Sequence, residues 1–368
     1  MLKAIASKTL IRVVVLSVLA ISAANIVLAQ PEQTDLTIDA ATRTQMIDTM
    51  LKRLNDSYVF PEVAKKMEVS IRERVDKKEY DQITSSKELA TKLTNDLQAI
   101  SNDKHLRVRY SYQPLPEREH QRQPSADERE QRRRELNWAN HGFAKVERLP
   151  GNIGYIEFYN FMDEELGADT VAAAMNFITN TDALIIDMRN NGGGNPAMVA
   201  LVCSYLFGTE PVHLNDLYWR EGNRTEEFWT KKELAGKRYL SKDVYVLTSK
   251  RTFSGAEEFT YNLKNLKRAT IVGETTGGGA HPGGGFRINE HFMMFVPMGR
   301  AINPITKSNW EGTGVTPDVS VPADQALLTA RLMALKKALA TIRPDLKAAA
   351  EAEIGKLEKE LSALKAKS

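Results

Sequence analysis

Apolar positions in the first hundred residues recur at the three- and four-residue spacing of amphipathic helices. Pro61 suits the first turn of a second helix, and Ser85 followed by Glu88 forms the start signal of a third. We therefore expect three antiparallel helices, which form a small N-terminal helical domain at residues 30–104. The apolar positions that set this spacing are Met46, Met50, Leu54, Leu89, Leu93 and Leu97.

The next segment, residues 105–142, predicts one strand and a polar linker. Leu106 to Tyr110 alternates apolar and charged residues, which is typical of a half-buried strand. Gln113 to Glu135 is rich in proline, glutamine and charge, so it predicts a surface linker or mobile loop. The basic residues in this stretch alternate with glutamates, which favours a solvated segment over a nucleic-acid site.

Strands and helices alternate through residues 143–325, which we expect to form the main domain. The apolar runs at 183–187 and 244–247 are typical of strands buried on both faces. Such alternation predicts an α/β fold with a mixed, largely parallel sheet. The expected strands are 153–158, 183–187, 244–247 and 269–272, and the expected helices are 168–178, one that opens at Pro196, and 253–266.

Residues 326–368 continue as a C-terminal helical extension. Ile354, Leu357, Leu361 and Leu364 step by three and four residues, so they share one apolar face. This face suits packing on the body of the protein or on a second copy. The C-terminal helices are therefore candidates for a homo-oligomer contact.

Residues 1–29 have the pattern of a signal peptide. Lys3 and Lys8 supply a positive charge, an apolar stretch follows, and Ala29 ends a short Val-Leu-Ala cleavage pattern. We expect an exported protein, periplasmic or secreted, with no stable membrane insertion after cleavage. An uncleaved anchor is the alternative, although the apolar run is short for a bilayer.

Composition narrows the classes of function. The net charge of +3 gives little attraction for nucleic acid. The single cysteine, Cys203, lies in an apolar helical stretch, so we expect a buried thiol without a disulfide. Neither His-Glu-x-x-His nor a cysteine cluster occurs, so we expect no metal and no cofactor. The glycine-rich turns match neither phosphate-binding fingerprint, which argues against a nucleotide-binding protein.

One serine stands where a buried strand is expected to give way to a helix. Ser254 would gain there from the helix N-terminal amides, which stabilise developing negative charge. Gly255 lets a substrate carbonyl approach the backbone closely. Serine is also a common helix cap, and the sequence lacks the Gly-x-Ser-x-Gly signature. Ser254 is thus a candidate nucleophile whose role depends on its partners.

Three further segments supply candidate partners. Residues 187–194 read Asp-Met-Arg-Asn-Asn-Gly-Gly-Gly, a turn whose amides suit an oxyanion. His105 precedes the first strand and suits the removal of a serine proton. Glu311 lies in a glycine-rich turn, from which a carboxylate can orient an imidazole. Each segment alone also fits a plain turn, a satisfied histidine or an exposed carboxylate, so the combination carries the information.

Taken in order, these motifs resemble those of the tail-specific, or carboxy-terminal-processing, serine peptidase superfamily. That superfamily includes the tricorn core protease and the repeats of interphotoreceptor retinoid-binding protein. The resemblance implies a crotonase-like ββα core and a serine peptidase that acts on proteins or peptides. The matching motifs are residues 187–194, 252–259, 272–278 and 311–318.

The resemblance also assigns a nucleophile and an oxyanion hole. Ser254 matches the nucleophile, and the backbone amides of Gly193 and Gly255 match the oxyanion hole. The processing peptidases carry a lysine base after a Gly-Glu-x-Thr-x-Gly motif, but Gly279 occupies that place here. A serine–lysine dyad is therefore not available from this motif.

The tricorn-like branch uses a histidine base and a glutamate that orients it. His105 and Glu311 match these positions, so the resemblance implies a Ser-His-Glu constellation. Lys104 stands where the tricorn core has a serine, which leaves a fourth member open. His281, in the glycine-rich loop, is the reserve candidate for the base.

The same superfamily holds ligand-binding members, so a binding module for apolar ligands is the alternative to a serine-type endopeptidase. Retention of the serine, histidine and glutamate together favours the enzyme. The linker at Gln113–Glu135 is too short and too polar for a PDZ-type module. A preference for C-terminal tails therefore stays open beside general endopeptidase activity.

Overall fold

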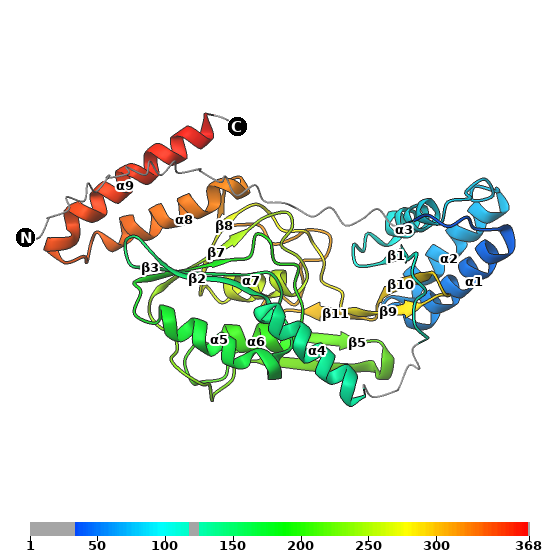
Figure 1. The fold of residues 1–368 in the computed structure, drawn as a ribbon, viewed down its shortest axis with the longest axis horizontal. Helices are drawn as coiled ribbons and strands as arrows, with labels where there is room; N and C mark the ends of the chain where they lie inside the picture. Colours follow the sequence, from blue (N-terminus) through cyan, green and yellow to red (C-terminus); the bar gives the residue numbers. More distant parts are fainter. Residues whose placement is uncertain (1–33, 118–124, 367–368) are drawn as a thin grey trace, which may run out of the picture. The chain divides into compact units, whose positions relative to one another are not determined.

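The computed structural model describes residues 34–117 and 125–366 (Figure 1). The predicted signal peptide lies outside the described residues. From Asp35 on, the chain forms one compact unit. Within the described ranges, every helix is too short or too polar to cross a membrane.

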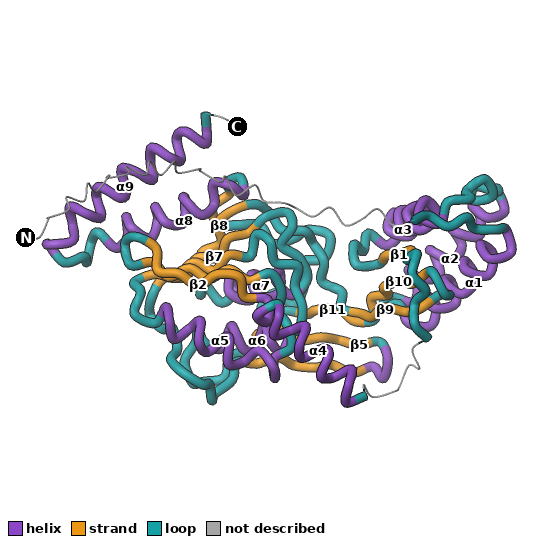
Figure 2. Tube along the Cα trace, in the orientation of Figure 1, coloured by secondary structure: helices purple, strands orange, loops and turns teal. Residues whose placement is uncertain are grey.

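A six-stranded sheet forms the centre of this unit (Figure 2). Its strand order is β12-β8-β7-β4-β3-β2, and all neighbours run parallel except β2, which is antiparallel to β3. Every residue of β4 is buried, as its apolar run predicts. The expectation of a largely parallel sheet is therefore confirmed. The strands are β2 (Phe143–Leu149), β3 (Ile153–Phe158), β4 (Ala183–Asp187), β7 (Asp243–Thr248), β8 (Thr270–Gly273) and β12 (Val319–Ser320).

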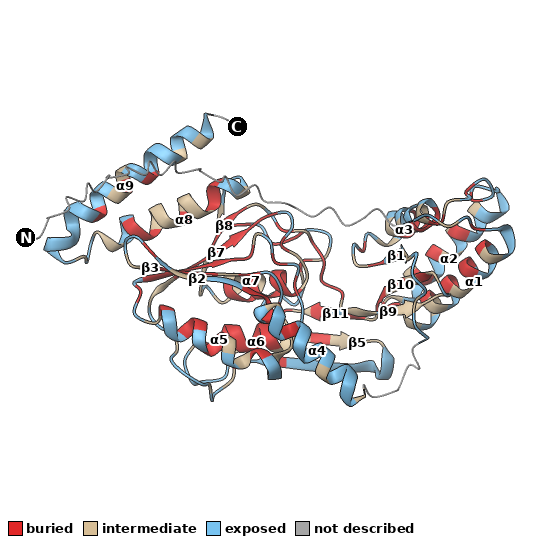
Figure 3. Ribbon diagram, in the orientation of Figure 1, coloured by how far each residue is buried: buried red, intermediate tan, exposed pale blue. Residues whose placement is uncertain are grey.

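Helices cover both faces of this sheet, because successive side chains of a strand point to opposite sides. Leu184 and Ile186 of β4 pack in the core shared with α5, α6 and α7, and Ile185 packs in the core that contains α8. Figure 3 shows α5 and α6 on one side of the sheet and α8 on the other. Cys203 of α6 is a free, fully buried thiol, as expected. The helices are α5 (Glu164–Ile178), α6 (Pro196–Ser204), α7 (Gly255–Asn265) and α8 (Ala323–Ala338).

The three expected N-terminal helices are present, and Ser85 caps the third by accepting from the Glu88 amide at 3.0 Å. These helices share one apolar core with β1 and β10, a strand from the second half of the chain. The helical region is thus completed by a distant segment, which the domain division expected from sequence does not include. The elements are α1 (Ala40–Ser57), α2 (Pro61–Asp76), α3 (Ser86–Ser101), β1 (Arg107–Tyr110), β9 (Gly283–Arg287) and β10 (Phe292–Pro297).

Two small antiparallel sheets complete the strands, and sequence periodicity missed most of their members. One has the order β1-β10-β9 and the other has the order β11-β5-β6. The glycine-rich β9 lacks the apolar alternation that marks a strand. The members of the second sheet are β5 (His213–Trp219), β6 (Arg224–Trp229) and β11 (Gly299–Ile302).

The prediction of a linker or mobile loop at Gln113–Glu135 is wrong in its second half, because α4 (Ala126–Trp138) is a helix. The Ser125 hydroxyl accepts from the Glu128 amide, and the Glu128 carboxylate accepts from the Ser125 amide. This capping box satisfies two amides that a helix start leaves unpaired. Leu136 is the one buried residue of α4. The capping box therefore stabilises the start of this helix, and the high charge of the segment led us to predict a linker instead.

The C-terminal helix α9 (Pro344–Lys365) packs against α8. Ile354 and Leu357, two members of its predicted apolar face, are buried in the core that contains α8. Two of the four residues of that face are therefore covered within the chain, while Leu361 and Leu364 are half-buried. The homo-oligomer that we expected through these helices remains a prediction without this support.

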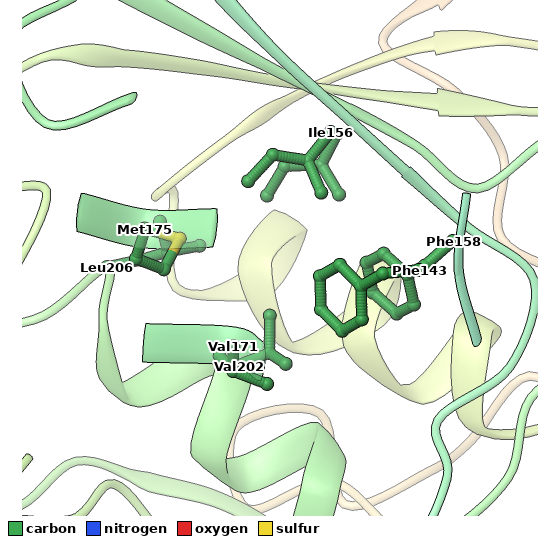
Figure 4. Close-up of a pocket in the computed structure, with 8 residues that line it drawn as sticks. Phe143, Ile156, Phe158, Val171, Met175, Val202 and Leu206 are labelled. Carbon is green, nitrogen blue, oxygen red and sulfur yellow. The ribbon is translucent and has the colours of Figure 1, made fainter. Parts of the chain in front are cut away.

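A small void lies between the central sheet and helices α5 and α6 (Figure 4). Its volume is about 10 Å³ and its walls are apolar. The rings of Phe143 and Phe158 stack beside it at 4.8 Å between centroids. A void of this size barely admits one water and offers it no polar partner, so we assign it to core packing.

The buried Phe158 predicts a large loss of stability on truncation. Phe158→Ala should lower the free energy of unfolding by about 3–5 kcal/mol, because it removes a fully buried ring from a close-packed layer. Phe177→Ala is the matched control, since that ring on α5 is 61% exposed and should change stability by less than about 0.5 kcal/mol. Urea unfolding followed by circular dichroism measures both. Equal effects of the two substitutions would contradict this packing.

Candidate functional site

The candidate nucleophile follows β7, and the glycine turn follows β4, its parallel neighbour. The carboxyl ends of parallel strands meet at one edge of a sheet, so the two loops lie together. The Ser249 hydroxyl donates to the Arg189 carbonyl at 2.6 Å, and the Thr252 hydroxyl donates to the Met188 carbonyl at 2.8 Å. These bonds bring the two sequence motifs into one site.

Ser254 adopts a backbone conformation that is rare for a residue with a side chain. Its φ is 54° and its ψ is −123°. The Ser254 carbonyl accepts from the amides of Glu257 and Glu258 at 2.8 and 3.0 Å, so α7 begins directly after it. Strain of this kind persists only where the surroundings impose it, and it clusters at functional positions. The geometry therefore supports Ser254 as more than a helix cap.

The surroundings that impose this conformation centre on Glu257, which is completely buried. Its carboxylate accepts from the Ser254 amide at 2.9 Å, the Gly278 amide at 2.6 Å and the Gly279 amide at 2.9 Å. The Thr276 hydroxyl donates to it as well. Burial raises the pKa of Glu257, and these hydrogen bonds oppose that shift. Our sequence interpretation missed this role, although the Ser-x-x-Glu spacing of a capping box was visible.

The glycine turn and the start of α7 each supply one free amide, but the two are not the pair we expected. The Gly193 amide donates to the Asn191 side chain at 2.8 Å, so it already has an acceptor. In the described part of the chain, no residue accepts a hydrogen bond from the amides of Gly194 or Gly255. A Cβ added at Gly255 would lie 3.0 Å from the Gly194 nitrogen. The structure thus places the Gly194 amide, rather than that of Gly193, as the free donor beside Gly255.

Close approach explains why residue 193 is a glycine. Gly193 has φ of +98°, and an added Cβ there would lie 2.5 Å from the Gly255 nitrogen and 2.8 Å from the Ser254 Cβ. A side chain would therefore strain the backbone and push the two loops apart.

His105 lies against the nucleophile turn. Its ring centroid is 4.6 Å from that of Phe253, the residue before Ser254, and 5.8 Å from that of Phe295. The His105 amide donates to Asp103 at 3.0 Å, and no described residue hydrogen bonds to the buried Nδ1. Burial lowers the pKa of His105 to about 4, and Asp103 opposes the shift. The imidazole is therefore neutral near pH 7, as a base must be.

Glu311 contacts His281 and not His105, which corrects the pairing that we expected. His281 Nδ1 lies 2.7 Å from an Asp103 oxygen and 3.4 Å from a Glu311 oxygen. The Tyr58 hydroxyl donates to Asp103 at 3.1 Å. Burial and the nearby Asp103 raise the pKa of Glu311 to about 7. Asp103 thus links the two histidines, since it also accepts from the His105 amide.

Hydrogen bonds across the glycine loop explain this pairing. The Trp310 indole donates to the Gly279 carbonyl at 2.7 Å, and the Ala280 amide donates to Glu311. These bonds hold residues 279–281 along residues 310–311. The glycine loop therefore positions His281, rather than His105, beside the Glu311 carboxylate.

The cluster of Asp103, His281 and Glu311 has the composition of a metal site, with ligand atoms within 4.8 Å of one another. Asp103 accepts from Tyr58 and pairs with His281, and one oxygen of Glu311 accepts from the Ala280 amide, whereas Glu311 Oε1 has no partner among the described residues. We therefore interpret it as a charged network that joins the helical region to the glycine loop.

The role of Glu257 is testable by an isosteric substitution. Glu257→Gln should lower the free energy of unfolding by about 2 kcal/mol or more. The side-chain NH₂ group of glutamine would replace one carboxylate oxygen and would then face the buried amides that donate to that oxygen. Glu210→Gln, at an exposed position, is the matched control and should change stability by less than about 0.5 kcal/mol. Chemical denaturation measures both variants. A Glu257→Gln protein as stable as its control would rule out the bridging role.

Comparisons with known proteins bear on these elements. The model of Peptidase family S41 matches residues 152–321, and the model of the N-terminal domain of Peptidase_S41 in eukaryotic IRBP matches residues 37–137. The carboxyl-terminal-processing peptidase 2, chloroplastic, of Arabidopsis thaliana is 27% identical over 187 residues. That match covers 47% of this chain and 34% of the relative, so it spans about a third of the relative's length.

Two solved structures share the fold over nearly their whole length. A putative peptidase from Parabacteroides merdae ATCC 43184 has a TM-score of 0.57 at 17% identity, with 82% of this chain and 99% of that chain covered. A lipoprotein from Streptococcus agalactiae has a TM-score of 0.54 at 15% identity, with 80% and 96% covered. The two family models match in the order that the motifs predict, and the chain therefore belongs to peptidase family S41.

Proposed function

We propose that this protein is a serine-type endopeptidase that cleaves peptide bonds through an acyl-enzyme on Ser254. The observation that carries the proposal is the strained Ser254 turn at the start of α7, with the amides of Gly194 and Gly255 unpaired beside it. Membership of peptidase family S41 supports the class of serine peptidase hydrolases. The substrates are proteins or peptides, and the chemistry needs no cofactor.

The reaction follows from these groups. The Ser254 hydroxyl passes its proton to the neutral His105 imidazole while its oxygen attacks the scissile carbonyl. The free amides of Gly194 and Gly255 hold the oxyanion. The imidazolium then gives its proton to the leaving amine, and an ester remains on Ser254. Water attacks this ester with His105 again as base, which releases the new carboxyl terminus and restores the serine.

His105 is the proposed base because its ring packs on the residue that precedes Ser254. Asp103 favours the charged form of this imidazole, so it stabilises the imidazolium that forms. Glu311 then acts at a distance, as a positioning residue that holds His281 and, through it, Asp103. This arrangement keeps the Ser-His-Glu set that the family resemblance implies and adds Asp103 and His281 to it.

A second assignment has His281 as the base, because its contact with Asp103 at 2.7 Å has the form of a carboxylate that orients an imidazole. Both assignments share Ser254 and the two amides. They differ in which histidine is indispensable, and single substitutions separate them.

A binding module for apolar ligands is the alternative function. The apolar void of the core has only about 10 Å³, so a lipid-like ligand does not fit at that place (Figure 4). The polar groups gathered around Ser254 also favour hydrolysis over apolar binding. We further propose that the protein acts after export, in a periplasm or outside the cell, once residues 1–29 are removed.

Substitution of the nucleophile tests the proposal directly. Ser254→Ala should lower peptide hydrolysis by more than about 10³-fold, because the neighbouring hydroxyls of Ser249 and Thr252 already donate to backbone carbonyls and cannot replace the nucleophile. It should also abolish labelling by a diphenyl phosphonate, which reacts with an activated serine. Ser308→Ala, at an exposed loop position, is the matched control and should hydrolyse and label like the natural protein. Unchanged hydrolysis or labelling of Ser254→Ala would refute the assignment.

The pH dependence of kcat/KM tests the base. If His105 is the base, its pKa, lowered to about 4, keeps the imidazole unprotonated above that pH. On the acidic side of the profile, kcat/KM should therefore fall near pH 4 rather than near the ordinary histidine pKa of 6.5. His105→Ala should cost about 10²–10⁴-fold in kcat/KM. His281→Ala should cost less and leave the position of the limb intact. A total loss in His281→Ala with an active His105→Ala would transfer the role to His281.

A further inference from the structure

One face of the sheet β1-β10-β9 turns away from the N-terminal helices. Successive side chains of a strand point to opposite faces, and directly paired residues share a face. Val108 of β1 is paired with Met294 of β10, and both are buried in the core of those helices. The residues one position away therefore lie on the opposite face, which we call the arginine face. They are Arg107, Arg109, Met293, Phe295, Gly285 and Arg287.

The arginine face is continuous with the proposed active site. The Phe295 ring stacks on the His105 imidazole at 5.8 Å between centroids, and the same imidazole packs on Phe253. Burial is the main cause that lowers the pKa of His105 to about 4, and the charges of His281 and Arg107 contribute. Arg107 is thus close enough for its charge to reach the proposed base. A peptide held at the nucleophile can therefore extend onto this face.

The three arginines of this face carry charge that little in the chain compensates. Within the described ranges, Arg109 is exposed and its side chain makes no hydrogen bond or ion pair. Arg107 and Arg287 each donate Nε to a backbone carbonyl, at 2.8 and 3.2 Å. The one carboxylate that pairs with these arginines in the same ranges is Glu117, which lies 3.9 Å from Arg287 and whose side chain is 89% exposed. The face therefore favours a ligand with negative charge.

We propose that the arginine face binds carboxylates in the part of the substrate that follows the scissile bond. The inference rests on the proposed peptidase function. Because the imidazole of His105 gives its proton to the leaving amine, the residues after the cleaved bond extend from the side of His105. Arg109 and Arg287 lie opposite Met293 on its two neighbouring strands, so a carboxylate above Met293 is within reach of two guanidinium groups. The half-buried side chains of Met293 and Phe295 supply an apolar floor for the peptide.

Matched peptides test this surface. They share one scissile bond and differ only in the residues after P1′, which are glutamates in one and the near-isosteric glutamines in the other, and both end in an amide. At about 0.05 M salt, kcat/KM should favour the glutamate peptide by about fivefold or more, because weak exposed ion pairs add over several arginines. A third peptide combines the glutamines with a free C-terminal carboxylate. A preference for either charged peptide over the neutral one supports the proposal and identifies the source of the carboxylate.

Salt and substitution check the same ratio independently. Raising the salt to about 0.5 M should reduce the preference about threefold or more, because ions screen exposed charges. Arg109→Gln should reduce it about twofold or more, and Arg109→Gln with Arg287→Gln should bring it near one. Arg132→Gln, at an exposed position of α4, is the matched control and should keep the ratio of the natural protein. A ratio near one for both charged peptides, or an unchanged ratio in the double variant, would overturn the proposal.

Binding to the Ser254→Ala protein separates the surface from the reaction. Fluorescence anisotropy should give a Kd for the preferred charged peptide about fivefold or more below that for the neutral peptide. Equal Kd values and equal kcat/KM values would overturn the surface and leave the peptidase intact. If the natural protein cleaves no peptide and takes no phosphonate label, while the difference in Kd persists, the peptidase is overturned and the surface is retained as a binding site.

Discussion

The buried carboxylate of Glu257 holds the nucleophile turn and the glycine loop together. It accepts from the amide of Ser254 and from the amides of Gly278 and Gly279, which are distant in the chain. A carboxylate is stable in the interior only when such donors surround it, so the loops and the charge depend on one another. The rare backbone conformation of Ser254 persists because this arrangement imposes it.

The rest of the site is built outward from that contact. The parallel strands β4 and β7 end side by side, which places the glycine turn against Ser254. The glycine loop continues into β9 and β10, and β10 completes the core of the N-terminal helices. The same connection brings His281 to Asp103, a residue 178 positions earlier in the chain. Fold and site are therefore coupled, because one segment serves both.

Much of the fold and part of the site could be predicted from short stretches of the sequence. The apolar runs of β4 and β7 and the helix starts at Pro61, Ser85 and Pro196 are properties of short windows, and they appear where they were expected. The motif around Ser254 likewise placed a serine at a strand-to-helix turn. Its partner histidines were also identified as candidates from sequence.

Long-range geometry was not predictable from such windows. The contact of Glu311 with His281 depends on how residues 279–281 run along residues 310–311, which no spacing encodes. The Gly193 amide is engaged by Asn191, a detail of turn conformation that three successive glycines leave undetermined. α4 was missed because its capping box lies within a highly charged stretch, and charge was given more weight than capping.

A crystal structure of the protein after reaction with a diphenyl phosphonate tests the central claim most directly, since the adduct reports nucleophile and oxyanion site together. We expect phosphorus bonded to the Ser254 oxygen, with the phosphoryl oxygen within hydrogen-bond distance of the Gly194 and Gly255 amides. Phosphorus on another residue, or a phosphoryl oxygen turned away from both amides, would contradict the account.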